Sequence, residues 1–333
     1  MITRRRGLAL AASSGLLVLP GLSARAEAAK KKIAVVVKIG GIPWFNAMEV
    51  GIKRAGAETG TDAWMVGPTQ ADAAQQVAAI EDLIARKVDV IGVVPNDADA
   101  LVPVFQRAHA AGIKIITHES PLQQGNDWDL EFTTPAADGV RHFEALAQAM
   151  GGVGQYMIIV GSLTVPQHRM RADAAVALQK AKYPKMELVG GRFGVGESLD
   201  DSYRTVLDQI RAHPKLKGVL AFGSQGPIGG ARAVDDRGKI GKIFVVGPFS
   251  PGQGAKYIRS GAITVGYIWN PLLAGETIVR IGALILSGKS VTNGMVLPEV
   301  GAVTVDPTTR VIMANKIQPI TKETIDSLVA LGL

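Results

Sequence analysis

The chain has 333 residues, of which 47% are hydrophobic and 20% are charged. This length predicts about two domains with a core each, and the composition excludes an intrinsically disordered chain. The net charge is +7, but the only Lys/Arg run after the N-terminal arginines covers residues 30–32, so no nucleic-acid binding is expected. The sequence has no cysteine, which excludes disulfides, zinc–thiolate sites and thiol nucleophiles.

Residues 1–28 have the pattern of a secretory signal peptide. Arg4-Arg5-Arg6 gives a positive start, residues 7–22 are mostly apolar, and residues 24–26 and 26–28 both fit an Ala-x-Ala cleavage site. The arginine run also resembles a twin-arginine export signal. An uncleaved anchor or a disordered tail is the alternative. We expect cleavage and export of the mature chain to the periplasm.

A regular alternation of strand-like and helix-like segments follows this leader. Continuous apolar runs predict strands at 33–37, 63–66, 88–94 and 114–117, and helices are expected at 47–58, 73–86 and 98–111. This order is typical of a doubly wound parallel sheet.

The same alternation then starts again. Helices are expected at 138–150, 170–182, 199–213, 228–236, 254–260 and 273–286, and strands at 156–160, 186–189, 219–222, 243–246 and 263–268. The predicted fold class is therefore α/β, with two doubly wound parallel-sheet lobes joined by a hinge. The expected lobes are residues 30–133 plus 269–298, and residues 134–268 plus 299–333, with three crossings between them.

Motifs of enzymes and cofactor sites are missing from the sequence. There is no Walker A loop, no HExxH and no GxSxG, and the glycines at 151–154 follow a predicted helix, as a helix stop does. We predict no enzyme activity, no cofactor and no metal site. His109, His142 and His213 lie on or just after predicted helices and are expected at the surface.

His118 and Glu119 differ from these histidines because they directly follow a predicted strand. Ligands of open α/β sheets bind beyond the carboxyl ends of the strands. The pair has three interpretations: a catalytic dyad, a hydrogen-bonding pair for a ligand, or a solvated loop.

Polar and aromatic residues follow most of the other predicted strands as well. Trp44 and Phe45 suit stacking on the apolar face of a sugar ring, or burial in the core. Neutral hydrogen-bonding side chains with a few charges match the mixed donors and acceptors of a sugar or polyol. The candidate ligand residues are Lys38, Trp44, Phe45, Asn96, His118, Glu119, Gln167, His168, Gly223, Ser224, Phe249, Trp269 and Asn270.

Residues 30–333 resemble the periplasmic sugar-binding proteins of ABC transporters, of the ribose-binding type. The resemblance rests on residues 42–45 (IPWF), on Gly67-Pro68-Thr69 with residues 75–77 (QQV), on residues 89–101 (DVIGVVPNDADAL), and on residues 245–247 (VVG) with Gly275. It implies the type I fold, closure by hinge rotation, and a monomer that presents its ligand to an ABC permease and its ATPase. A repressor-type sensing domain shares this fold, but a leader-like segment fills the place of its helix-turn-helix.

Within that group, Lys38, Gly67-Pro68-Thr69, Thr164-Val165 and Trp269 are most similar to the autoinducer-2-binding and rhamnose-binding subfamily. Three ligand-facing segments depart from it: Glu119 replaces an Asp, Gln167-His168 replaces an Asp-Gln pair, and residues 222–224 (FGS) replace a Pro-Asp-Ala stretch. We therefore expect a sugar or sugar alcohol, contacted by Glu119, Gln167 and His168. A periplasmic receptor for autoinducer-2 or another small ligand, feeding a sensor, is the alternative.

Overall fold

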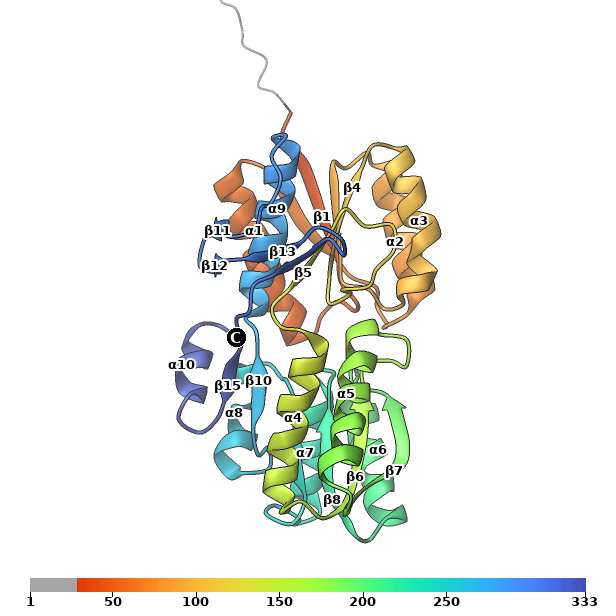
Figure 1. Cartoon of the computed structure of the whole chain (residues 1–333), viewed down its shortest axis with the longest axis vertical. Coiled ribbons are helices and arrows are strands. Elements are labelled where there is room, and N and C mark those ends of the chain that lie inside the picture. Colours follow the sequence, from red (N-terminus) through yellow and green to blue (C-terminus); the bar gives the residue numbers. More distant parts are fainter. Residues whose placement is uncertain (1–28) are drawn as a thin grey trace, which may run out of the picture.

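The computed structural model describes residues 29–333, and the predicted signal peptide lies outside the described residues. Two α/β lobes lie end to end (Figure 1), as the sequence predicts. None of the helices in the described range has the length and hydropathy of a membrane span.

The first lobe is built on a seven-stranded sheet in the order β13-β14-β5-β4-β3-β1-β2. Neighbouring strands run parallel except for the β13–β14 pair. The strands are β1 (Lys32–Val36), β2 (Asp62–Val66), β3 (Val90–Val93), β4 (Lys114–His118), β5 (Trp128–Glu131), β13 (Thr304–Asp306) and β14 (Val311–Met313).

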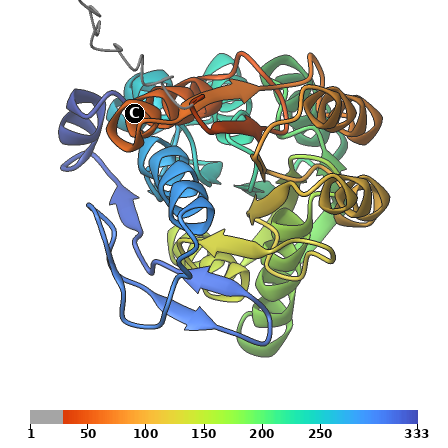
Figure 2. The same ribbon diagram turned by 90° about the horizontal axis from the view of Figure 1, so that it is seen from above.

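Helices cover both faces of this sheet. Helices α2 (Ala73–Ala85) and α3 (Ala98–Ala110) pack on one face, while α1 (Pro43–Thr59) and α9 (Pro271–Leu286) pack side by side on the other (Figure 2). Burial on both faces explains why residues 33–37 form a continuous apolar run.

The second lobe contains a four-stranded parallel sheet in the order β7-β6-β8-β9. Its strands are β6 (Gly154–Val160), β7 (Met186–Gly194), β8 (Leu216–Ala221) and β9 (Phe244–Val246). Its helices are α4 (Pro135–Met150), α5 (Pro166–Lys182), α6 (Leu199–Ala212), α7 (Gly226–Asp236) and α8 (Pro251–Ser260). The short strand β10 (Gly266–Ile268) pairs with β15 (Gln318–Ile320), and α10 (Ile325–Ala330) packs on α8. A small hairpin joins β11 (Val296–Leu297) and β12 (Gly301–Ala302).

Proline marks the start of several helices that follow sheet edges. Pro43, Pro135, Pro166, Pro251 and Pro271 each occupy the first helical position, where the fixed backbone angle suits a helix and the missing N–H costs no hydrogen bond. The first of these helices therefore begins at residue 43 and not, as expected, at residue 47, and Trp44 and Phe45 lie in its first turn.

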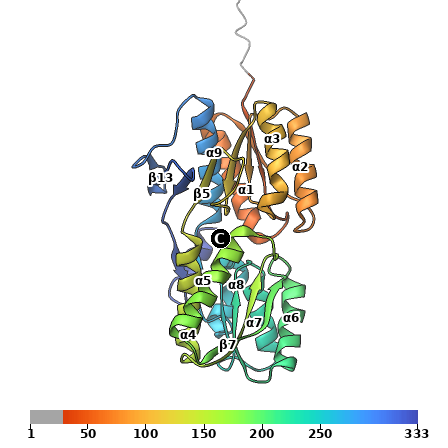
Figure 3. The ribbon, with the colours of Figure 1, turned by 45° about the vertical axis from the view of Figure 1, so that its right-hand side comes forward.

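The C-terminal tail differs from the sequence prediction. Residues 299–333 were expected in the second lobe, but within them β14 pairs with β5, so β13 and β14 add to the sheet of the first lobe. Only the following residues, from β15 onward, pack with the second lobe. The chain passes between the lobes after β5, after β10 and after β14, and these segments lie on one side of the molecule (Figure 3).

Candidate ligand-binding site

A small cavity lies between the two lobes, at the carboxyl ends of both sheets. Residues from both lobes and from the crossing after β10 form its wall. The lining residues are Lys38, Trp44, Phe45, Glu119, His168, Arg171, Glu197, Phe222, Ser224, Pro248 and Trp269.

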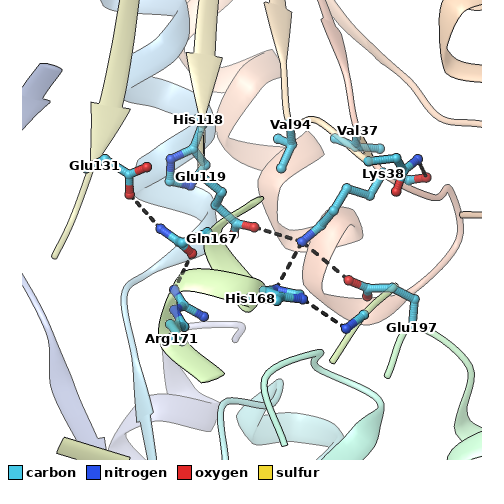
Figure 4. Close-up of polar contacts among 12 residues, drawn as sticks. Val37, Lys38, Val94, His118, Glu119, Glu131, Gln167, His168, Arg171 and Glu197 are labelled. Carbon is cyan, nitrogen blue, oxygen red and sulfur yellow. Dashed lines mark hydrogen bonds and ion pairs between the residues drawn. The ribbon is translucent and has the colours of Figure 1, made fainter. Parts of the chain in front are cut away.

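Lys38 is at the centre of the polar contacts in this cavity. It directly follows the apolar run that contains β1, and its Nζ lies 2.7 Å from Oε2 of Glu119, 3.3 Å from Oε1 of Glu197 and 3.4 Å from Nε2 of His168 (Figure 4). Burial acts to lower the pKa of Lys38, but the carboxylates of Glu119 and Glu197 outweigh burial and raise the pKa above its ordinary value. Lys38 is therefore a buried cation, held by one carboxylate from each lobe.

Glu119 is the partner of Lys38 in the first lobe. Burial acts to raise the pKa of Glu119, but the adjacent Lys38 ammonium outweighs it and lowers the pKa below its ordinary value. Its backbone has a φ of 63°, a left-handed conformation that is uncommon for a residue other than glycine. The carboxylate is thus ionised and held in place by a tight turn after β4.

The two ring nitrogens of His168 have different surroundings: Nδ1 accepts a hydrogen bond within the second lobe, and Nε2 faces Lys38 of the first lobe. The backbone N–H of Gly161 donates to its Nδ1 at 3.0 Å, so the neutral ring carries its proton on Nε2. Burial, together with Lys38 and Arg171, lowers the pKa of His168 well below its ordinary value and keeps the ring neutral. Because Nε2–H and the Lys38 ammonium are both donors, their contact is not a hydrogen bond, and both can donate to a ligand oxygen.

Gln167 joins the two lobes beside the cavity without lining it. Its Nε2 donates to Oε2 of Glu131 at 2.6 Å, and its Oε1 accepts from Nη2 of Arg171 (Figure 4). Arg171 is fully buried, lies 4.7 Å above the Trp269 ring and pairs with Asp138 at 3.0 Å. The amide of Gln167 is thus occupied by protein groups, and the guanidinium of Arg171 lines the cavity in its place.

Two carboxyl groups lie together just before the first crossing between the lobes. Asp129 and Glu131 are both fully buried on β5, two residues apart and therefore on one face of the strand. Burial raises the pKa of Asp129 to about 6, and burial with the adjacent Asp129 raises the pKa of Glu131 well above its ordinary value. The pair therefore retains a proton to higher pH than free carboxyl groups do.

Aromatic rings form the apolar part of the cavity wall. Trp44 packs edge-to-face on Trp269, with ring centroids 5.3 Å apart and planes at 82°. Trp44 and Phe45 are 4% and 1% exposed, and they belong to the core of the molecule as well as to the cavity wall. The two interpretations of Trp44 and Phe45, as stacking residues and as core residues, are therefore compatible, because the same rings belong to the core and to the cavity wall.

Seven of the predicted ligand residues line the cavity: Lys38, Trp44, Phe45, Glu119, His168, Ser224 and Trp269. Three further predicted residues, Gln167 and the two described next, lie beside the cavity and support its lining residues. Asn96 donates to the backbone carbonyl of Lys38 at 2.8 Å, and Nδ1 of His118 lies 2.6 Å from the carbonyl oxygen of Leu130.

The other three predicted ligand residues have structural roles. Gly223 allows a close backbone approach, because a Cβ there would lie 2.5 Å from the Gly196 carbonyl oxygen. Phe249 is buried in the hydrophobic core and packs against Gly254 and Gly266, where an added Cβ would lie within 3 Å of its ring. Asn270 caps α9 by accepting from the N–H groups of Leu272 and Leu273.

Four lining residues were not among the candidate ligand residues: Arg171, Glu197, Pro248 and Phe222, the last of which belongs to the ligand-facing segment 222–224 named above. Arg171 lies one helical turn after Gln167, so the i, i+4 spacing could have indicated it. Glu197 was missed because β7 was expected to end at residue 189, whereas a register irregularity lets it continue to Gly194.

The position of His142 differs from the sequence prediction. It was expected at the surface but is fully buried, where Nδ1 lies 2.9 Å from the Asp138 carbonyl oxygen and the ring packs against Phe222 and Tyr267. Burial lowers its pKa. A helix that packs on a sheet has a buried face and an exposed face. The periodicity of the sequence alone did not show that His142 lies on the buried face of α4.

Known proteins with similar sequences are bacterial binding proteins. The chain is 22% identical to the ribose import binding protein of Bacillus subtilis over 77% of this chain and 82% of that protein. It is 27% identical to the D-ribose/D-allose-binding protein of Pseudomonas aeruginosa over 74% of this chain and 80% of that protein.

Solved structures with the same fold include a solute-binding protein. That protein, from Clostridium phytofermentas with bound L-rhamnose, superposes with a TM-score of 0.84, 20% identity, and coverage of 91% of this chain and 99% of the other. The LsrB protein of Clostridium saccharobutylicum in complex with AI-2 gives a TM-score of 0.82 at 19% identity, with coverage of 89% and 99%. Because the family model described as periplasmic binding protein domain matches residues 33–290, this chain belongs to that family.

Proposed function

We propose that this chain is a periplasmic solute-binding protein that captures an uncharged sugar or sugar-like polyol and delivers it to an ABC importer. The observation that carries the proposal is the cavity between the lobes, which combines aromatic walls with a buried network of charged donors and acceptors. The relatives named above, which bind ribose or allose, support the same class of ligand.

The cavity suits a polyhydroxylated ligand for two reasons. The rings of Trp44, Phe45 and Trp269 can cover the apolar C–H face of a sugar ring and exclude water. The donors of Lys38 and His168 and the carboxylate of Glu119 can bind hydroxyl groups, each of which both donates and accepts.

Binding across both lobes gives the ligand a means to favour the closed form. A ligand shifts a conformational equilibrium only by its difference in affinity for the two forms. Contacts with Glu119 in the first lobe and His168 in the second are available together only when the lobes are closed. The closed monomer would then dock on a membrane permease with its ATPase.

We infer binding without catalysis at this site. His118, the candidate member of a catalytic dyad, packs its ring on Phe132 and Trp269, and its Nδ1 is engaged by the Leu130 carbonyl oxygen. Its neighbour Glu119 is engaged by Lys38. The pair therefore supports and lines the site, and neither group is arranged to transfer a proton to the other.

A thermal-shift screen of the mature protein tests the proposed function. The panel is D-ribose, D-allose, D-xylose, D-arabinose, L-rhamnose, xylitol and autoinducer-2, and calorimetry follows for every compound that raises the melting temperature. We expect a sugar or polyol to bind and autoinducer-2 to bind weakly, because Gln167 and His168 do not supply the acceptors of an Asp-Gln pair. Submicromolar binding of autoinducer-2 would overturn the ligand class, and no binding by any compound would contradict the proposal.

Export is the second part of the proposal. Residues 1–28 carry the signal-peptide pattern described above, and membership of a periplasmic binding protein family is consistent with it. N-terminal sequencing of protein from a periplasmic extract should begin between Ala24 and Lys31. Recovery of chains that begin at Met1 from the cytoplasm would contradict export.

A further inference from the structure

Glu197 comes from the loop between β7 and α6 and connects the second lobe to the first. Its Oε1 lies 3.3 Å from Nζ of Lys38 (Figure 4). Among the ion pairs formed within residues 29–333, this is the one that joins the two lobes. Opening of the cleft would therefore leave Lys38 with Glu119 and expose Glu197 to water.

The Glu197 carboxylate is buried but not satisfied by protein groups. The residue is 6% exposed and lines the cavity, and within residues 29–333 its Oε1 has an ion pair with Lys38 but no hydrogen-bond partner. A buried carboxylate oxygen without a hydrogen bond is costly. A ligand hydroxyl in the cavity would remove that cost by donating to it.

The backbone around Glu197 is shaped to place this oxygen next to His168. A Cβ at Gly161 would lie 2.5 Å from Glu197 Oε1 and 2.8 Å from His168 Nδ1, so a larger residue there would force both side chains to shift. A donor, His168 Nε2–H, and an acceptor, Glu197 Oε1, both from the second lobe, lie 3.4 Å and 3.3 Å from the same Lys38 Nζ. Such a pair matches a hydroxyl group or two adjacent hydroxyl groups.

The charges around the cavity also restrict what can enter it. Two cations, Lys38 and Arg171, line the cavity together with two carboxylates, those of Glu119 and Glu197. The charges of these four side chains balance, so an ionised acidic ligand would add an uncompensated negative charge to a buried site, where charge is poorly screened. Glu197 is the carboxylate of this group that the second lobe contributes directly to the cavity wall.

We propose that Glu197 closes the cleft from the second lobe by accepting a ligand hydroxyl on Oε1, beside its ion pair with Lys38, and that its charge makes the site select neutral sugars over acidic ones. This inference rests on the proposed function, because it assigns a role in the same cavity. It adds a specificity-determining residue that the sequence did not indicate.

The test compares Glu197→Gln with wild type by calorimetry, using the neutral sugar of the panel that binds wild type most tightly. The amide keeps the size of the side chain and removes its charge, so we expect affinity to fall about tenfold, as for the loss of a charge-assisted hydrogen bond. Asp201→Asn is the matched control. It also replaces a carboxylate by an amide, four residues later, at a side chain that is 49% exposed and paired with Arg204. The affinity of Asp201→Asn for the neutral sugar should stay within about twofold of wild type.

A second arm tests charge selection with D-glucuronate and D-galacturonate. Wild type should show no binding of these uronates at concentrations that saturate with the neutral sugar, and Glu197→Gln should bind them measurably. Glu197→Asp keeps the charge but withdraws the oxygen, so it should weaken the neutral sugar while still excluding the uronates.

The outcomes separate the two proposals. Equal affinity of Glu197→Gln and Asp201→Asn for the neutral sugar would overturn the role of Glu197, and so would uronate binding by wild type as tight as that of the sugar. Failure of wild type to bind any sugar would instead overturn the proposed function itself. Thermal melting of each variant without sugar establishes that it is folded.

Discussion

Among the described residues that line the cavity, Lys38 and Glu119 of the first lobe bind each other at 2.7 Å, whereas Arg171, Glu197 and Ser224 of the second lobe keep polar atoms without hydrogen-bond partners. The first wall is also supported from behind. Gln76 bonds to the backbone of Val37, Val94 and Asn96, residues that lie at the ends of β1 and β3 or follow them.

This difference suggests a division of roles between the lobes. Groups that are already held in place lose little conformational freedom when a ligand arrives, so the first wall is suited to bind first. Unpaired groups gain most when a ligand supplies their missing partners, so the second wall is suited to close on a ligand that is already bound.

Replacement of Lys38 by Met should have the largest effect, because it removes the cation from between two buried carboxylates. Loss of one partner of a buried pair typically costs about 3–5 kcal/mol of unfolding free energy. Urea unfolding of Lys38→Met measures this, and Lys53→Met is the control, since Lys53 is 64% exposed and pairs with Glu49 on the surface. Equal stability of the two variants would show that the first wall does not depend on Lys38.

Trp44→Ala should weaken sugar binding by about 1–3 kcal/mol through loss of a buried aromatic contact. Calorimetry measures the change, with Trp64→Ala as the matched control. Trp64 lies on β2, outside the cavity wall, with the Arg86 guanidinium 5.0 Å above its ring. Wild-type affinity in Trp44→Ala and also in Phe45→Ala, with both variants folded, would place these rings in the core alone.

Gln76→Ala should destabilise the first wall, because it removes the side chain that bonds to the backbone behind that wall. The change leaves two carbonyl oxygens and one N–H without their buried partner, at a cost of about 1–2 kcal/mol in unfolding free energy. The adjacent Gln75→Ala is the control, because the Gln75 side chain accepts an exposed hydrogen bond from the Thr69 hydroxyl and the bond of its backbone N–H to Asp72 is kept in the variant. If Gln75→Ala destabilises the protein as much as Gln76→Ala does, the support assigned to Gln76 is wrong.

The carboxyl pair at the crossing after β5 predicts a smaller, pH-dependent effect. Burial raises the pKa of Asp129 from 3.8 to about 6, so the folded protein binds a proton that the unfolded chain releases. That contribution is fully present below pH 3.8 and is lost as the pH rises through about 6. Between about pH 5 and pH 7, the unfolding free energy of wild type should therefore fall by about 1 kcal/mol relative to that of Asp129→Asn. If the unfolding free energies of the two proteins change with pH in the same way, the raised pKa of Asp129 is wrong.

Much of this architecture could be predicted from the sequence because buried parallel strands leave continuous apolar runs. Residues 33–37 and 88–94 show the strands directly, and the residues that follow them include Lys38 and Asn96 at the sheet edge. The same logic located Glu119, His168 and Trp269 in the cavity wall.

The remaining features depend on contacts that local patterns do not record. Gly190 and Gly191, with φ of 68° and 78°, let β7 continue past an irregularity, and Glu197 could not be placed until the end of that strand was known. Strands β13 and β14 have three residues each, too few to show a period, and their place beside β5 is decided by tertiary pairing.

Small-angle scattering of the mature protein with and without its sugar tests the central claim most directly. If the second lobe closes on a ligand held by the first, saturation with the tightest-binding sugar of the panel should reduce the radius of gyration of wild type. Glu197→Gln, at a sugar concentration that saturates it, should compact less completely. An unchanged scattering curve for wild type at saturating sugar would contradict closure of the two lobes around the ligand.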